Sequence, residues 1–298
     1  MSLIVAIEQG KNKTDCVVFD LNQQSVVQRS QVTLNPVASD NGAYQEYDPD
    51  EIYESVVEAI VSCISRIEGL KEKDILSLGI AAQPGTAVAW DRLTGKPLAN
   101  AISSDDARTN ELVNTMIKKT PDCNSYHFYD QTGLPLNGFF SAFKYKWLLE
   151  NVSGVRRAMI ENRLAFGTID SWIVFKLTLG SRFVTEVTSA SKTMLMNIET
   201  FSYDPVLLKN LNGGECKLSG VTTFLPSISV DQRERIHKKW TGSVQRSFQW
   251  KPLKNFQDCK CKNEHKSRNC VTCSLPKALI CGLTGSALGY LFMRRGMK

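Results

Sequence analysis

Residues 164–198 read LAFGTIDSWIVFKLTLGSRFVTEVTSASKTMLMNI, and this stretch decides the fold. It opens with a short apolar run at 164–166, which a Gly-Thr pair separates from an apolar helical segment at 170–177. A loop rich in Ser and Thr then leads to a second apolar run at 194–198. The order strand, helix, loop, strand predicts an α/β layer domain.

The first twenty residues predict a β-hairpin. Residues 3–7 and 16–20 are apolar and β-prone. Between them lies EQGKNKTD, with Gly10 and Asn12 at the tip of the expected turn.

A helix is expected to follow this hairpin. Asp48 is a candidate N-cap, Pro49 suits the first helical position, and Glu51 stands at N3. Apolar residues then recur at every fourth position: Ile52, Val56, Ile60 and Ile64. Such a stripe predicts that the helix covers a sheet.

Further elements follow in the same α/β pattern. Residues 76–81 and 86–90 are apolar runs typical of buried strands, and the second ends in a turn at 91–95. Asp105 is a candidate cap for the next helix, and residues 141–151 predict an amphipathic helix.

The composition places the chain among ordinary globular proteins. It has 298 residues, of which 42% are hydrophobic and 22% charged, enough for one large domain or two modest ones. No apolar run reaches the length of a transmembrane span, and the N-terminus lacks the basic region of a signal peptide. We therefore expect a cytoplasmic protein whose nine cysteines are mostly reduced.

The positive charge is concentrated in one segment. Residues 231–277 hold 12 Lys or Arg and 4 Asp or Glu, a balance of +8, whereas the whole chain carries +6. A basic segment can meet phosphate-bearing partners, but a solvated loop is the simpler interpretation, and no nucleic-acid partner is expected.

Four cysteines in this segment have a spacing that can bind a metal. Cys259 and Cys261 are separated by one residue, Cys270 and Cys273 by two, and His265 lies between the pairs. Four thiolates can hold zinc tetrahedrally. The Cys-x-Cys pair is tighter than a usual zinc knuckle, so zinc stays a hypothesis beside free loop cysteines.

Two segments of the opening stretch also resemble a known family. GTIDSWIVFKLT and VTEVTSASKTMLMNI are similar to the FGGY carbohydrate kinases and most of all to the glycerol kinases, which read close to GTIDSWL-x-KLT and VTDVTNASRTMLFNI. Other stretches agree: AIEQG, GAYQEYDPDEIYES, WDRLTGKPLANAI, TGLPL and FFSAFKYKWLLENV. The resemblance covers residues 3–230, with a short echo near residue 280.

The resemblance implies the actin-like ATPase fold, which is ribonuclease H-like. It assigns residues 1–230 to the family's N-terminal, substrate-binding domain and 231–278 to a divergent basic insert with cysteines. Residues 279–298 would be a remnant of the start of the C-terminal nucleotide lobe, so most of that second lobe is expected to be missing.

In this family the first hairpin approaches the nucleotide phosphates. Family members usually read DQGTTSTR, whereas this chain has Glu8, Gln9, Gly10, Lys11, Asn12, Lys13, Thr14 and Asp15. The resemblance implies that Glu8 stands for an aspartate that helps to hold metal and phosphate, and Glu is longer by one methylene. Lys11 and Lys13 are either phosphate-attracting charges or solvated turn residues.

The implied polyol pocket has lost its hydrogen-bonding groups. Glycerol kinases read NQRETT, whose Arg and Glu bind the hydroxyls, and here Pro84 and Gly85 take those two positions. Ser104 replaces a tryptophan wall, Ala107 one of two arginines, and Phe139 a tyrosine whose hydroxyl meets substrate. These changes together predict lost polyol binding, because a small polyol has few other groups to hold it. Pro84–Gly85 is then simply a tight turn.

The general base of the family also has no counterpart. Residues 281–289, CGLTGSALG, resemble a segment whose aspartate takes the proton from the substrate hydroxyl, and Leu283 falls at that position. Since a positioned base contributes roughly 10² to 10⁴ in rate, no intact catalytic residue is expected.

Three hypotheses follow. The first is a catalytically inactive glycerol-kinase-like protein that acts by binding, as a homo-oligomer or in pairing with a full-length glycerol kinase. The second is an active ATP- and Mg-dependent glycerol or polyol kinase with altered specificity, with Asp105 or Asp106 near its substrate. The third is a truncated gene product with little function of its own.

Overall fold

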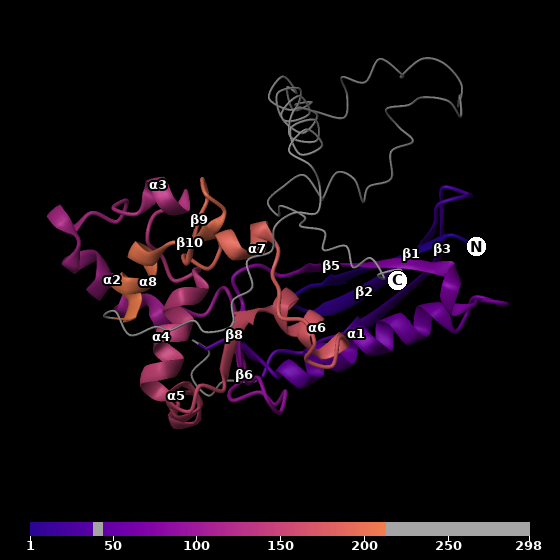
Figure 1. Ribbon diagram of the computed structural model, residues 1–298, viewed down its shortest axis with the longest axis horizontal. Helices are drawn as coiled ribbons and strands as arrows, with labels where there is room; N and C mark the ends of the chain where they lie inside the picture. The colour runs from indigo at the N-terminus through magenta and orange to yellow at the C-terminus, as the bar shows by residue number, and fades with distance from the viewer. Residues whose placement is uncertain (38–43, 213–298) are drawn as a thin grey trace, which may run out of the picture. The chain divides into compact units, whose positions relative to one another are not determined.

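The computed structural model describes residues 1–37 and 44–212 (Figure 1). Their strands form two four-stranded sheets and a short two-stranded one. The first sheet has the order β3-β2-β1-β5, with β1 (Leu3–Gln9), β2 (Lys13–Asp20), β3 (Ser25–Thr33) and β5 (Ile75–Ala82). The second has the order β4-β7-β6-β8, with β4 (Glu46–Tyr47), β6 (Ala87–Asp91), β7 (Ala101–Ile102) and β8 (Leu164–Thr168).

Helices occupy most of the remaining described chain. The α-helices are α1 (Pro49–Ile64), α2 (Asn110–Lys119), α3 (Tyr129–Thr132), α4 (Ser141–Asn151), α5 (Ser153–Ile160), α6 (Ile169–Leu177), α7 (Val187–Ser191) and α8 (Pro205–Asn212). Short 3₁₀ helices are η1 (Glu72–Asp74), η2 (Ala107–Thr109) and η3 (Pro121–Cys123), and the small sheet pairs β9 (Met196–Asn197) with β10 (Ser202–Tyr203).

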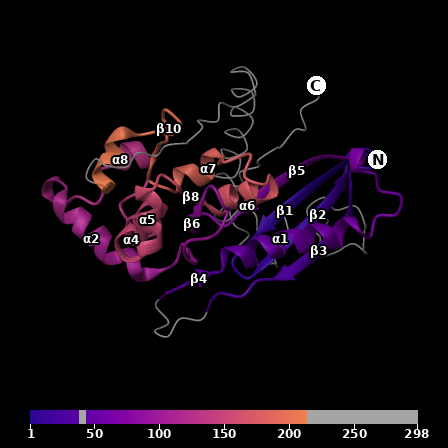
Figure 2. The ribbon, with the colours of Figure 1, turned by 60° about the horizontal axis from the view of Figure 1, so that its bottom comes forward.

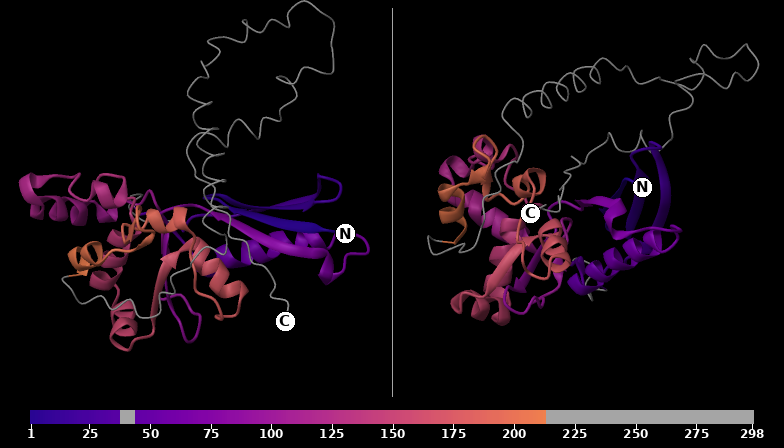
Figure 3. Two further views of the ribbon diagram at one scale, coloured as in Figure 1. Left: turned by 45° about the horizontal axis from the view of Figure 1, so that its top comes forward. Right: turned by 45° about the vertical axis from the view of Figure 1, so that its right-hand side comes forward.

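The first sheet begins with the predicted hairpin. Strand β1 pairs antiparallel with β2 and parallel with β5, and the turn closes with a bond from Gly10 N to Lys13 O of 2.9 Å. Helix α1 lies along one face of this sheet (Figure 3). The predicted cap is confirmed, because the Asp48 side chain accepts a hydrogen bond from Asp50 N at 2.9 Å.

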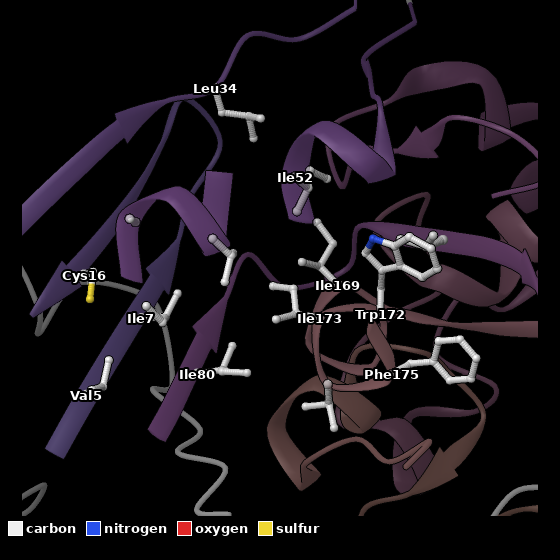
Figure 4. Packing of buried hydrophobic residues seen from close by; sticks show 14 of the residues in the cluster. Val5, Ile7, Cys16, Leu34, Ile52, Ile80, Ile169, Trp172, Ile173 and Phe175 are labelled. Atoms are coloured by element: carbon white, nitrogen blue, oxygen red, sulfur yellow. The ribbon is translucent and has the colours of Figure 1, made fainter. Parts of the chain in front are cut away.

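Helix α6 joins the cores of the two sheets. Its residues Ile169, Trp172 and Ile173 are completely buried, in one hydrophobic cluster with residues of both sheets (Figure 4). The ring centroids of Trp172 and of Trp90 in β6 are 5.3 Å apart. Trp172 Nε1 donates a hydrogen bond to Pro49 O at 2.8 Å. The segment predicted to decide the fold therefore lies at its centre.

The second apolar run differs from its prediction. A strand was expected over 194–198, but only Met196–Asn197 form β9, because Met194 has a positive φ of 62° that interrupts an extended backbone. The Ser- and Thr-rich loop also contains helix α7. Glu186 caps this helix by accepting from Thr188 N at 2.7 Å and Ser189 N at 2.5 Å.

The cap expected at Asp105 was also wrong, because the N-cap of the following helix α2 is Thr109 and the capping carboxylate nearby is Asp106. The Asp106 side chain accepts from Arg108 N at 2.9 Å and starts η2, which runs directly into α2. In Figure 2, α4 and α5 lie together beside β6 and β8, and the contacts between these elements agree. Within residues 1–37 and 44–212, no helix combines the length and apolarity that crossing a bilayer requires.

Candidate functional site

A chain of hydrogen bonds connects the hairpin turn with the implied polyol positions. Gln83, between β5 and β6, donates from Nε2 to Gln9 Oε1 at 3.3 Å and to Gly10 O at 3.4 Å. Thr86 Oγ1 donates to Gln83 Oε1 at 3.2 Å and accepts from Ser104 N at 3.1 Å. The structure therefore brings together segments that the sequence separates by about 90 residues.

Both hairpin lysines are paired with carboxylates. Lys11 forms an ion pair with Asp105. The hydrogen bond from Lys11 lowers the pKa of the Asp105 carboxyl. Lys13 pairs with Asp15 at 2.9 Å, a bond that raises the lysine's pKa, and contacts Gln31 Oε1 at 3.1 Å. Neither lysine presents an unmatched charge to a phosphate.

The other hairpin residues differ in burial and in their partners. Thr14 is completely buried, and its hydroxyl shares a hydrogen bond of 2.7 Å with Ser55 Oγ in α1. Glu8 and Asn12 are exposed, and the Asn12 carbonyl accepts from Leu34 N. The Thr14 hydroxyl is therefore already paired inside the fold, while Glu8 and Asn12 face solvent.

The implied polyol positions are packed against each other. Gly85 is buried with φ +77°, and a β-carbon built on it would lie 2.9 Å from Phe139 O and 3.0 Å from the Phe139 ring. Ser141 Oγ donates to Gly85 O at 3.3 Å. The segment containing Pro84 and Gly85 is thus a turn, as the turn interpretation predicted, and the Phe139 ring lies on it.

A buried lysine adjoins these positions and was missed by the sequence analysis. Lys144 in α4 is 0% exposed, and its Nζ donates to Gly138 O at 2.8 Å and Phe139 O at 2.9 Å. Burial lowers its pKa to about 7, opposed by the charges of Asp106 and Asp105. The ammonium holds the turn that carries Phe139.

The spacing of α4 contained a signal for this burial. Lys144 stands four residues after Phe140 and four before Leu148, both completely or almost completely buried. Residues at this spacing share one helix face, so the lysine falls within the apolar stripe.

Arg108 forms the second charged cluster near the site. Its side chain is 2% exposed and pairs with Asp106 at 2.8 Å and Glu46 at 2.6 Å. The guanidinium also lies over the rings of Tyr44, 4.0 Å from the centroid, and Trp147, 4.7 Å away. Two carboxylates and two rings thus surround the Arg108 guanidinium, so this cluster fixes the 106–108 segment and its charge is already paired.

Several predicted site residues lie outside the described part of the chain. These are the base position Leu283 and the four zinc candidates Cys259, Cys261, Cys270 and Cys273. Within the described ranges, no group of three or more His, Cys, Asp or Glu side chains could hold a metal ion.

Comparison with known sequences identifies the relatives of this chain. The FGGY family of carbohydrate kinases, N-terminal domain, matches residues 3–228. The glycerol kinase of Shewanella woodyi is 40% identical over 235 residues, which are 78% of this chain and 45% of that protein. A probable glycerol kinase of Caenorhabditis elegans is 38% identical over 200 residues, 66% of this chain and 39% of that protein.

Comparison with solved structures leads to the same family of proteins. The Plasmodium falciparum glycerol kinase with ADP has a TM-score of 0.65 at 31% identity, over 72% of this chain and 41% of that one. A xylulose kinase from Lactobacillus acidophilus has a TM-score of 0.59 at 23% identity, a likeness of fold alone. The chain thus spans less than half the length of these relatives. With the predicted actin-like ATPase fold confirmed, the chain belongs to the FGGY family of carbohydrate kinases and contains that family's N-terminal domain.

Proposed function

We propose that this chain is a glycerol-kinase-like protein that no longer phosphorylates polyols and acts by binding a protein partner. The contact of Phe139 with Gly85 carries this proposal. It lies where the family resemblance puts the Arg and Glu that bind the hydroxyls, and neither Pro84 nor Gly85 has a polar side chain.

The binding free energy lost with the two hydrogen-bonding side chains decides whether polyol binding is weak or absent. A hydrogen bond to a charged group contributes about 1.5 to 3 kcal/mol. Two such bonds amount to about 3 to 6 kcal/mol, or roughly 10² to 10⁴ in affinity. A relative with millimolar affinity would therefore become a protein with no measurable polyol binding.

An active kinase with altered specificity is the competing function. It would use Lys11 and Lys13 on the phosphates of ATP and Asp105 or Asp106 near the substrate. The ion pairs of both lysines and the hydrogen bonds that Arg108 donates to Asp106 favour the inactive protein.

The deciding experiment measures ATP-dependent phosphorylation of glycerol and a panel of small polyols by the purified chain. Calorimetry with ATP and with glycerol runs alongside, and the Shewanella woodyi glycerol kinase serves as positive control. We expect no turnover and no heat of binding. Turnover of about 1 s⁻¹, in the ordinary range of enzymes, would reject the proposal in favour of the competing function.

The binding role needs a separate measurement. We propose a partner of the same family, either a second copy of this chain or a full-length glycerol kinase. Light scattering of the chain alone, and of its mixture with a full-length relative from the same organism, should show a defined complex. If all components stay monomeric at micromolar concentration, the binding role has no support.

A further inference from the structure

We propose that three neighbouring turns at one end of the second sheet form a surface that docks on a bilayer containing anionic lipids. The turns are residues 91–97, 160–163 and 178–182, and together they are called the three-turn surface. The inference does not depend on the proposed loss of polyol phosphorylation, because none of these turns takes part in the hydrogen bonds around Gln83 and Gly85.

The three-turn surface carries the most exposed large apolar residues of the described chain. Leu179 is 93% exposed, Ile160 75% and Leu93 70%, and each lies in a different turn. No other large apolar residue with a described side chain exceeds 58%. A single exposed leucine needs no explanation, but apolar side chains that gather at one place mark a contact with a partner or a membrane.

Contacts between the turns keep them side by side. Arg92 N donates to Arg163 O at 2.8 Å, which joins the first turn to the second. The Phe175 ring joins the first turn to the third, because a β-carbon built on Gly95 would lie 3.5 Å from it and one on Gly180 3.4 Å. In Figure 1 the three turns lie in the lower part of the picture, next to α5, β6 and α6.

The third turn exposes its leucine in an unfavourable backbone conformation. Leu179 has a φ of +52°, in the left-handed region that glycine adopts readily and other residues seldom do. Its side chain is exposed, so the core gains nothing from it. Backbone strain of this kind gathers at places where a chain meets a ligand, and a leucine here indicates a contact outside the fold.

The charges around the turns complement an anionic surface. Residues 91–97, 156–163 and 178–182 hold six Arg or Lys and two Asp or Glu, a balance of +4. The two carboxylates, Asp91 and Glu161, both pair with Arg163. Asp50, at the start of α1, pairs with Lys176 of α6 at 3.0 Å. Four exposed cations have no ion pair in the described chain: Arg92, Lys96, Arg157 and Arg182.

This combination favours a lipid surface over a protein. A second copy of the chain would bring the same excess of positive charge against itself. Another protein would need a pocket for each of three separate side chains, whereas the interface of a bilayer accepts them without preformed pockets. Anionic headgroups would meet the Arg and Lys side chains while the aliphatic side chains reach the boundary of the acyl region.

The first test measures how the purified full chain sediments with vesicles of phosphatidylcholine, with and without phosphatidylserine. We expect Leu93→Ser/Ile160→Ser/Leu179→Ser to bind the phosphatidylserine vesicles at least about tenfold less than the natural chain, because the apolar contact is lost. Tyr126→Ser/Phe201→Ser is the control, since both residues are more than half exposed outside the three turns. It should bind like the natural chain. No binding by the natural chain, or equal binding by the triple variant, would overturn the proposal.

The second test removes the charge from the same surface. We expect Arg92→Gln/Lys96→Gln/Arg182→Gln to bind phosphatidylserine vesicles at least about tenfold less than the natural chain, since each cation near an anionic leaflet strengthens binding. Residues 231–277 carry positive charge of their own but are unchanged in every variant. A difference between variants therefore reports the three turns, and equal binding here would contradict an electrostatic contact at this surface.

Leu179→Gly separates membrane contact from folding. Glycine suits a φ of +52°, so the melting temperature should be no lower than that of the natural chain, while vesicle binding falls at least about threefold. A lower melting temperature with unchanged binding would show that this leucine serves the fold. If light scattering instead finds a dimer that the triple serine variant loses, and neither protein binds vesicles, the surface is a protein interface and the proposal is wrong.

Discussion

At the scale of single residues, the buried lysine in α4 dominates the electrostatics of the site. Lys144 is 0% exposed and keeps two carbonyl partners, yet burial lowers its pKa from 10.5 to about 7. A protein rarely buries a lysine without a role for its charge or hydrogen bonds. Here the hydrogen bonds hold the turn that carries Phe139.

The lowered pKa predicts a pH dependence of stability. Between about pH 7 and the ordinary lysine pKa, the unfolded chain binds more protons than the folded one, so the free energy of unfolding rises with pH. From pH 7 to pH 8.5 we expect the natural chain to gain about 1 to 2 kcal/mol relative to Lys144→Met. Urea unfolding of both proteins at the two pH values measures this difference.

The comparison is kept below pH 9, because titration of the Cys16 thiol changes the free energy of unfolding in the opposite direction. Burial raises the pKa of its thiol, so above the ordinary thiol pKa the folded state loses stability as pH rises. Parallel stability curves for the two proteins between pH 7 and 8.5 would show that Lys144 keeps its proton in the folded chain.

At the scale of elements, short segments are held by side chains from distant parts of the sequence. Strand β4 has only two residues, and the ion pair of its Glu46 with Arg108 ties it to η2. The Arg108 guanidinium lies in turn over the Trp147 ring of α4. No local propensity could stabilise so short a strand. The Glu46–Arg108 ion pair and the contacts of Arg108 with the rings of Tyr44 and Trp147 therefore stabilise this strand, whose backbone makes few hydrogen bonds.

Replacing Arg108 by Lys should therefore strongly destabilise the folded chain. Lysine cannot reproduce the bidentate bond to Asp106, whose side chain is completely buried, nor the contact of a planar guanidinium with the rings of Tyr44 and Trp147. We expect a loss of about 3 to 5 kcal/mol in the free energy of unfolding. Lys146→Met is the control, since its exposed ion pair with Glu150 should contribute less than about 1 kcal/mol. Equal effects of the two substitutions would contradict this account.

The start of α1 allows a smaller prediction. Asp48→Ala removes the acceptor for Asp50 N and should cost about 1 kcal/mol. Glu54→Ala, at an exposed position inside the helix, should change stability by less than about 0.5 kcal/mol. Thermal unfolding of both variants compares the cap with the solvated face.

At the scale of the whole described part, one hydrophobic cluster joins both four-stranded sheets. It contains Val5 and Ile80 from the first sheet, Trp90 and Ala165 from the second, and Trp172 from α6. Because both sheets share these contacts, we expect them to unfold in a single transition.

Trp172→Ala tests that expectation. The change removes a completely buried ring and its bond to Pro49 O, and should cost about 3 to 5 kcal/mol. Hydrogen exchange should show equal loss of protection in β1 and β8. Protection lost in β8 alone would mean that the two sheets unfold independently. Phe201→Ala, at a ring that is 51% exposed, is the control and should leave exchange in both strands unchanged.

The sequence by itself determined the hairpin and helices α1, α4 and α6, which follow from apolar periodicity and a capping aspartate. The family, and the positions expected to have lost polyol-binding side chains, followed from the resemblance of whole segments to known kinases. Only the tertiary structure decided that Lys11 meets Asp105, that Lys144 is buried, and that Phe139 lies on Gly85. Each of these depends on which distant segments the fold brings within contact, and neither periodicity nor residue type specifies that distance.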